Sequence, residues 1–136
     1  MPNVRIYPDT TQTTFLSSQA QEFREAYGIR NSSKLQDRTR QKNLIVEEFK
    51  EFLDADGDLW HKNPQYYEHC LKEVADIVYV CYQYCENMGW DLDRALHRVH
   101  QSNMSKLDDE GKPIYREDGK VLKGPNYKPP DLSDII

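Results

Sequence analysis

The sequence predicts an all-α protein with a single domain, residues 1–136, in which a bundle of four to five helices precedes a C-terminal arm. Apolar residues recur at helical spacing from about residue 9 to about residue 107. The chain then changes character, because residues 108–136 contain four of its seven prolines, and proline does not continue a helix. We therefore expect a helical core at about residues 9–107 and a hairpin or loop arm at about residues 108–136.

The first two helices are indicated by spacing and by residues that begin or end helices. Apolar side chains in loose helical spacing predict a first helix from about residue 10 to Tyr27, and Gly28 follows as its stop. Asp37 is a candidate cap for a second helix, which is expected to end near Gly57.

The third helix has the clearest boundaries. Asn63 is its candidate cap, Pro64 takes the first helical position, and Gly89 closes it. A fourth helix is expected to start at Asp91, with apolar residues along one side.

The arm combines turn residues with basic ones. The dipeptide Asp118-Gly119 lies between two short extended runs, which predicts a hairpin turn. Basic residues are dense from Lys106 to Lys128 in a chain of otherwise acidic composition. An acidic protein with one basic tail could bind a small polyanion there.

Composition excludes several classes of protein. A net charge of −5 argues against a nucleic-acid surface, which needs clustered Lys and Arg. No apolar run approaches the roughly 20 residues of a membrane span, and the N-terminus has no signal-peptide pattern, so we expect a cytoplasmic protein. Three cysteines, without a framework spacing, fit a reducing compartment.

Acidic residues interrupt the apolar stripes of the second and third helices. At about 100° per residue, Glu48 lies among the apolar residues of the second helix, and Glu73 lies among those of the third. A buried carboxylate must be neutralised, paired with a cation or bound to a metal ion. Lys50 is expected on the face opposite Glu48, and Lys72 well around the helix from Glu73. The sequence therefore offers these acids few basic side chains with which to pair.

Both helices repeat the acids at a spacing of three residues. When the helices pack, four carboxylates can meet, namely those of Glu48, Glu51, Glu73 and Asp76. Oxygen ligands favour Mg²⁺ or Mn²⁺, and Mg²⁺ commonly joins carboxylates to phosphate oxygens. The pattern thus indicates phosphate chemistry, in which Glu47 is placed to deprotonate a water molecule. The alternative is a pair of ordinary amphipathic helices whose glutamates lie in solvent.

The motifs "EEFKE" and "EVADIVYV" resemble the EExxE and ExxD pair of the all-α nucleoside triphosphate pyrophosphohydrolases, which include MazG-like and phosphoribosyl-ATP pyrophosphohydrolase-like proteins. The segment "SNMSK" is similar to the family's Asn and Lys segment. The tail is similar to the C-terminal arm of phosphoribosyl-ATP pyrophosphohydrolase-like members, including phage-encoded ones. The resemblance covers roughly residues 37–132.

The resemblance implies a Mg²⁺- or Mn²⁺-dependent enzyme that cleaves a nucleotide between its α- and β-phosphates, as a homodimer or a homotetramer. It implies that Glu48, Glu51, Glu73 and Asp76 bind the metal and that Glu47 activates water. Substrate-binding roles are expected for Asn103, Lys106, Lys123, Tyr127 and Lys128, and Gly124 would let the backbone approach the phosphates.

Substrate choice rests on analogy with the phage-type members. Purine deoxynucleotides such as dGTP or dATP are the first expectation, in nucleotide-pool control and in the host cytoplasm if the protein is phage-encoded. A dUTP or dCTP house-cleaning activity is the alternative, although the second helix lacks the "PKNL" spacing of dCTP-cleaving members. A non-catalytic helical oligomerisation module is the alternative from a different class.

Two further patterns are interpreted as structural. The acids at residues 54–58 alternate as in a calcium loop, but Leu59 and Gln65 stand where an EF-hand needs Gly and Glu. His97 and His100 share one side of the fourth helix without a CxxC or HExxH motif, so we expect no zinc site there.

Overall fold

The structure is a computed structural model that describes residues 16–136. It confirms the all-α prediction. The described part contains four α-helices and one short 3₁₀ turn, namely α1 (Leu16–Ala26), α2 (Leu35–Gly57), η1 (Leu59–His61), α3 (Pro64–Met88) and α4 (Leu92–Met104). None of these helices combines the length and the apolarity needed to cross a membrane.

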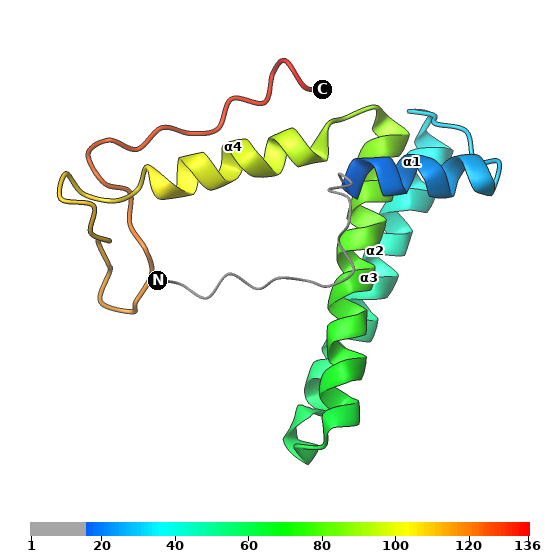
Figure 1. Cartoon of the computed structure of the whole chain (residues 1–136), viewed down its shortest axis with the longest axis horizontal. Coiled ribbons are helices and arrows are strands. Elements are labelled where there is room, and N and C mark those ends of the chain that lie inside the picture. The colour runs from blue at the N-terminus through cyan, green and yellow to red at the C-terminus, as the bar shows by residue number, and fades with distance from the viewer. Residues whose placement is uncertain (1–15) are drawn as a thin grey trace, which may run out of the picture.

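The helices form two limbs that meet at one end of the molecule (Figure 1). Helices α2 and α3 pack along each other as a long hairpin, which we call the hairpin limb, and α1 crosses its end. Helix α4 and residues 105–136 project away from this hairpin and form the lateral limb. Helix α4 contacts α1 and α3 but not α2. Among residues 16–136, α4 therefore contacts the other helices at the root of the lateral limb.

Helix boundaries confirm most of the predicted caps. The Asn63 side chain accepts a hydrogen bond from the Gln65 amide at 3.2 Å, and Gly89 ends α3 with a φ of +74°. Asp91 caps α4 through the Arg94 amide at 3.0 Å. The predicted part of the first helix before Leu16 lies outside the described residues.

The cap predicted at Asp37 is wrong. Helix α2 begins two residues earlier, at Leu35, and Asp37 lies within its first turn. There a carboxylate interacts favourably with the helix dipole, and it also pairs with Arg40 at 3.6 Å. Acidic residues are common both at the cap and in the first turn, so the sequence did not distinguish the two positions.

Polar contacts fix the root of the lateral limb. Asp93 of α4 accepts a hydrogen bond from the Tyr82 hydroxyl of α3 at 2.9 Å, and its other oxygen accepts the Ser17 amide of α1 at 3.3 Å. Buried Arg24 of α1 donates to Asn87 of α3 at 2.9 Å and to Gln83 at 3.2 Å. These bonds hold α1, α3 and α4 in one arrangement.

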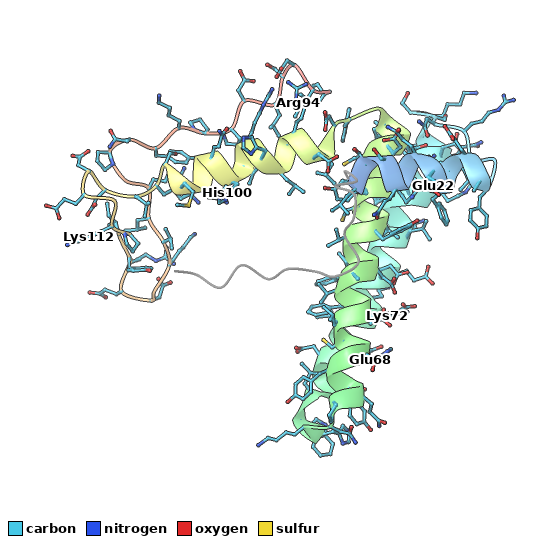
Figure 2. The ribbon with its side chains drawn as sticks, in the orientation of Figure 1. Glu22, Glu68, Lys72, Arg94, His100 and Lys112 are labelled. Atoms are coloured by element: carbon cyan, nitrogen blue, oxygen red, sulfur yellow. The ribbon has the colours of Figure 1, made fainter. Side chains whose placement is uncertain are left out.

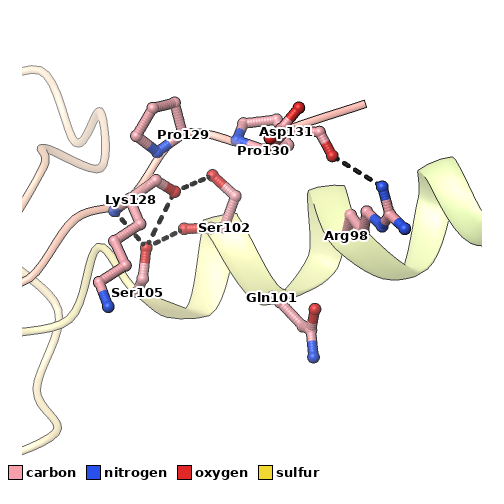
Figure 3. Close-up of a pocket in the computed structure, with 8 residues that line it drawn as sticks. All are labelled: Arg98, Gln101, Ser102, Ser105, Lys128, Pro129, Pro130 and Asp131. Carbon is pink, nitrogen blue, oxygen red and sulfur yellow. Dashed lines mark hydrogen bonds between the residues drawn. The ribbon is translucent and has the colours of Figure 1, made fainter. Parts of the chain in front are cut away.

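The C-terminal arm runs back along α4 (Figure 3). The Ser102 hydroxyl donates to the Lys128 carbonyl at 2.7 Å, the Lys128 amide donates to the Ser105 hydroxyl at 3.0 Å, and Arg98 donates to the Asp131 carbonyl at 2.9 Å. A hollow of about 440 Å³ lies among these residues. The arm is thus attached to α4 by its backbone.

The predicted hairpin turn is present in a minimal form. Tyr115 and Val121 form one antiparallel bridge, and between them Gly119 takes a φ of +85°, which favours glycine. The Gly119 amide donates to the Arg116 carbonyl at 2.9 Å and closes the turn.

Acidification should release the end of the arm. Asp134 forms a two-point ion pair with Arg98, which lowers the pKa of Asp134 from 3.8 to about 2. A lowered carboxyl pKa stabilises the folded arrangement above the unfolded pKa, and this contribution is lost as pH falls through the folded pKa. We expect the NMR amide signal of Asp91, which donates to the Ile135 carbonyl at 3.2 Å, to shift between about pH 4 and pH 2.

The variant Asp134→Asn should show that shifted Asp91 signal already at pH 7. An unchanged signal in the variant would contradict a role of this ion pair in holding the arm.

Gly124 makes a close backbone contact at the end of α4. A Cβ atom at Gly124 would lie 2.5 Å from the carbonyl oxygens of both Lys106 and Leu107. The close approach expected at Gly124 is therefore to the protein's own backbone, where the sequence suggested a phosphate.

Gly124→Ala should displace the arm, at a cost of about 1–3 kcal/mol. Faster amide hydrogen exchange in residues 108–136 would report the displacement. Gly57→Ala is the control, because a Cβ atom there meets nothing within 4 Å. Equal exchange in both variants would show that the contact at Gly124 does not hold the arm.

Candidate metal centre

Three of the predicted carboxylates converge where α2 faces α3. Glu48 from α2 and Glu73 and Asp76 from α3 each offer an oxygen, and these oxygens all lie within 4.8 Å of one another. The helical spacing explains this meeting, since Glu73 and Asp76 are three residues apart on the side of α3 that packs on α2. We call these three residues the acidic cluster.

Glu51 lies beside the acidic cluster. It is one turn after Glu48 and close enough to affect its titration, but it is exposed and outside the group of three. Together with exposed Glu47 it lines a hollow of about 370 Å³ on the outer side of α2. Glu51 therefore stands between the acidic cluster and the hollow that Glu47 faces.

Burial leaves the acidic cluster short of partners. Glu73 is only 3% exposed, and Oε2 of Glu73 and Oε2 of Glu48 are buried without a hydrogen-bond partner among the described residues. Burial raises the pKa of Glu48, and the neighbouring carboxylates of Glu51, Asp76 and Glu73 raise it further. Unpaired buried carboxylate oxygens are costly, and a hard divalent cation is the ligand that suits such oxygens. The residues present thus fit a Mg²⁺ or Mn²⁺ ion.

Lys72 is the residue at the acidic cluster that sequence reasoning misplaced. The prediction that Lys72 lies too far around the helix from Glu73 was wrong, because its long flexible stem carries the ammonium back across the helix face. The Lys72 Nζ atom lies 2.8 Å from Asp76 Oδ2 and 3.3 Å from Glu73 Oε1. His69 Nε2 lies 3.6 Å from the same Glu73 oxygen. The i,i+4 spacing of the Lys72–Asp76 and His69–Glu73 pairs was visible in the sequence.

The residues predicted to bind substrate lie on the other limb. Helix α4 and the arm carry all five of them, namely Asn103, Lys106, Lys123, Tyr127 and Lys128. In Figure 2, His100 and Lys112 mark this limb, well away from Lys72 on α3. The Lys123 ammonium lies 4.8 Å from the centre of the Tyr127 ring. A single chain does not bring these residues to the acidic cluster.

Residues 16–136 contain no second convergent group of His, Cys, Asp or Glu. Of the acids at residues 54–58, Asp54 and Asp56 lie in the last turn of α2 and Asp58 lies between α2 and η1. His97 and His100 belong to no such group in the described part of the chain.

Comparison with known proteins places the chain in a family. No curated protein matches the sequence closely. A model of the phosphoribosyl-ATP pyrophosphohydrolase family matches residues 11–103, which include the acidic cluster and end within α4. This family is part of the MazG-like all-α superfamily, whose members hydrolyse phosphoric anhydride bonds. The match spans more than half of the chain, and the protein therefore belongs to the phosphoribosyl-ATP pyrophosphohydrolase family of enzymes.

Proposed function

We propose that the protein hydrolyses a nucleoside or deoxynucleoside triphosphate to the monophosphate and pyrophosphate, in a reaction that depends on Mg²⁺ or Mn²⁺. The acidic cluster carries this proposal. It combines three converging carboxylates with two buried oxygens that have no partner among residues 16–136, in a chain that belongs to a pyrophosphohydrolase family.

Each acidic residue has a role in this proposal. Glu48, Glu73 and Asp76 would hold the cation, with Glu51 as a further ligand from the same side of α2. When bound, the cation supplies neutralisation of the charge on the phosphate oxygens. Glu47 accepts the proton of the attacking water, because it is exposed beside Glu51 and open to solvent.

Self-association is part of the proposal. On the side of α3 away from Asp76, the residues Tyr67, Leu71, Val74 and Val78 form a stripe with a spacing of three to four residues, and each is at least 40% exposed. Apolar stripes of this kind are typical of helix packing surfaces. We propose that a second copy covers this stripe, in a homodimer or a homotetramer.

In such an assembly, the lateral limb of one copy would contact a neighbouring copy. Asn103 and the basic residues of the arm do not reach the acidic cluster of their own chain, whereas a limb that projects from the hairpin can reach a neighbouring copy. The lysines there would neutralise the triphosphate or the leaving pyrophosphate.

For the substrate, we propose a purine deoxynucleotide, dGTP or dATP. The resemblance of the arm to that of phage-encoded members supports this choice. Hydrolysis of dUTP or dCTP is the second candidate, and a helical module without activity is the third.

The test is incubation of the purified protein with each common NTP and dNTP in Mg²⁺, Mn²⁺ or EDTA, with separate assays of pyrophosphate and phosphate. Metal-dependent formation of monophosphate and pyrophosphate is expected, fastest with dGTP or dATP. Release of single phosphates, or no turnover of any substrate, would contradict the proposed reaction.

A further inference from the structure

The positively charged side chain that pairs with the acidic cluster belongs to α3 itself. Among residues 16–136, Lys72 is the one lysine or arginine that pairs with Glu73 or Asp76, and none pairs with Glu48. Its ammonium bridges Asp76 Oδ2 and Glu73 Oε1, and both hydrogen bonds raise the pKa of Lys72, that to Asp76 more strongly. The ammonium therefore pairs with two of the three carboxylates of the candidate metal centre and leaves Oε2 of Glu73 without a partner among the described residues.

Lys72 is exposed to solvent, whereas the carboxylates that it pairs with are more buried. The Lys72 side chain is 61% exposed, whereas that of Glu73 is only 4% exposed and that of Asp76 is 34% exposed. Lysine has a flexible four-carbon stem, so the ammonium can leave the carboxylates without any movement of α3. The carboxylates stay in place when the ammonium leaves.

We propose that Lys72 is a resident counterion of the acidic cluster, which a divalent cation displaces and which then binds the phosphates of the nucleotide. An ammonium and a dication compete for the negative charge of the same carboxylates, and the dication has twice the charge and accepts more oxygen ligands. The displaced ammonium remains at the mouth of the centre on its stem. A triphosphate brought there offers it new anionic oxygens.

This inference rests on the proposed function and gives Lys72 two effects of opposite sign. Without nucleotide, Lys72 weakens metal binding, because its ammonium already neutralises part of the negative charge of Asp76 and Glu73 and repels a second cation. With metal bound, Lys72 strengthens nucleotide binding, because the ammonium lies next to the phosphates. A lysine that only stabilises α3 would have neither effect.

The experiment compares wild-type protein with Lys72→Met, which removes the charge and keeps the length of the stem. Mn²⁺ is titrated into metal-free protein by calorimetry, in the absence of nucleotide. We expect Lys72→Met to bind Mn²⁺ roughly fivefold more tightly, the scale of one exposed ion pair. At saturating Mn²⁺, its KM for the preferred nucleotide should rise roughly tenfold or more, with a smaller change in kcat.

Two control variants separate the pairing from net charge. Lys42→Met removes the same charge from an exposed position on α2, and Lys42 has no ion pair among the described residues, so its Mn²⁺ affinity should stay near that of the wild type. Lys72→Arg keeps the charge, so it should bind Mn²⁺ more weakly than Lys72→Met does.

Equal Mn²⁺ affinities of wild-type protein and Lys72→Met would overturn the counterion role, and an unchanged KM would overturn the phosphate role. The metal titration does not need turnover. A protein that hydrolyses no nucleotide but shows tighter Mn²⁺ binding in Lys72→Met would contradict the proposed function and support the counterion. An active enzyme whose Lys72→Met variant has unchanged Mn²⁺ affinity would support the proposed function and contradict the counterion role.

Discussion

Replacement of Glu73 by glutamine should abolish pyrophosphate release. The substitution keeps the volume of the side chain and removes its charge at the most buried position of the acidic cluster, where Glu73 is 3% exposed. Changes to residues that merely orient metal ligands cost about 10- to 100-fold, so loss of a ligand should lower kcat/KM by more than about 100-fold. Asp76→Asn should act in the same direction. Pyrophosphate assays and Mn²⁺ calorimetry measure the two losses.

Glu68→Gln is the matched control, since Glu68 lies exposed on the same helix (Figure 2) and outside the acidic cluster. It should retain wild-type activity. The helical circular dichroism of all three variants should match the wild type. In EDTA, Glu73→Gln should unfold at an equal or higher temperature, because one of several mutually repelling carboxylates is gone. Full activity in Glu73→Gln or Asp76→Asn would show that the acidic cluster is not the catalytic centre.

The second large effect is expected at Leu71, the most exposed residue of the apolar stripe on α3, at 69%. Leu71→Asp should dissociate the proposed assembly, because burial of a leucine side chain contributes about 1.5–3 kcal/mol. A symmetric interface contains two copies of the change, so the dimer dissociation constant should rise by more than about 100-fold. Light scattering after size-exclusion chromatography measures the mass. If the lateral limb acts on a neighbouring copy, activity should fall with dissociation.

Leu35→Asp is the control for this variant. Leu35 is also highly exposed, at 68%, and it lies at the first position of α2, where an acidic residue is well tolerated. Its mass should equal that of the wild type. A monomeric wild-type protein, or an assembly that Leu71→Asp leaves intact, would contradict the proposed interface.

Local sequence patterns predicted the parts of this molecule that depend on neighbours in the chain. Helix ends at Asn63, Gly89 and Asp91 follow from side chains and backbone conformations within a few residues. The meeting of Glu48 with Glu73 and Asp76 also follows from local spacing, once two consecutive helices pack on each other.

What the sequence could not supply depends on distant contacts or on side-chain conformation. Whether Lys72 extends over Asp76 is decided by the rotamers of a flexible side chain, and helical spacing alone assigned it to the wrong place. The separation of Asn103 from the acidic cluster depends on the direction in which α4 leaves α3. No periodic pattern encodes that direction, because Asp93, Tyr82 and Ser17 set it through contacts between three helices.

The shared carboxylate of Asp93 has a consequence for the far end of α4. Helix α4 has 13 residues and is therefore about 20 Å long, so a rotation of ten degrees at its first turn moves its last turn by roughly 3 Å. Asp93 lies in that first turn and contacts both α1 and α3. A small rotation at the first turn of α4 is thus amplified at its last turn, and Asp93 is one of the side chains that fix this first turn. In the proposed assembly, small changes at Asp93 would alter which surface of a neighbouring copy Asn103 and the arm can touch.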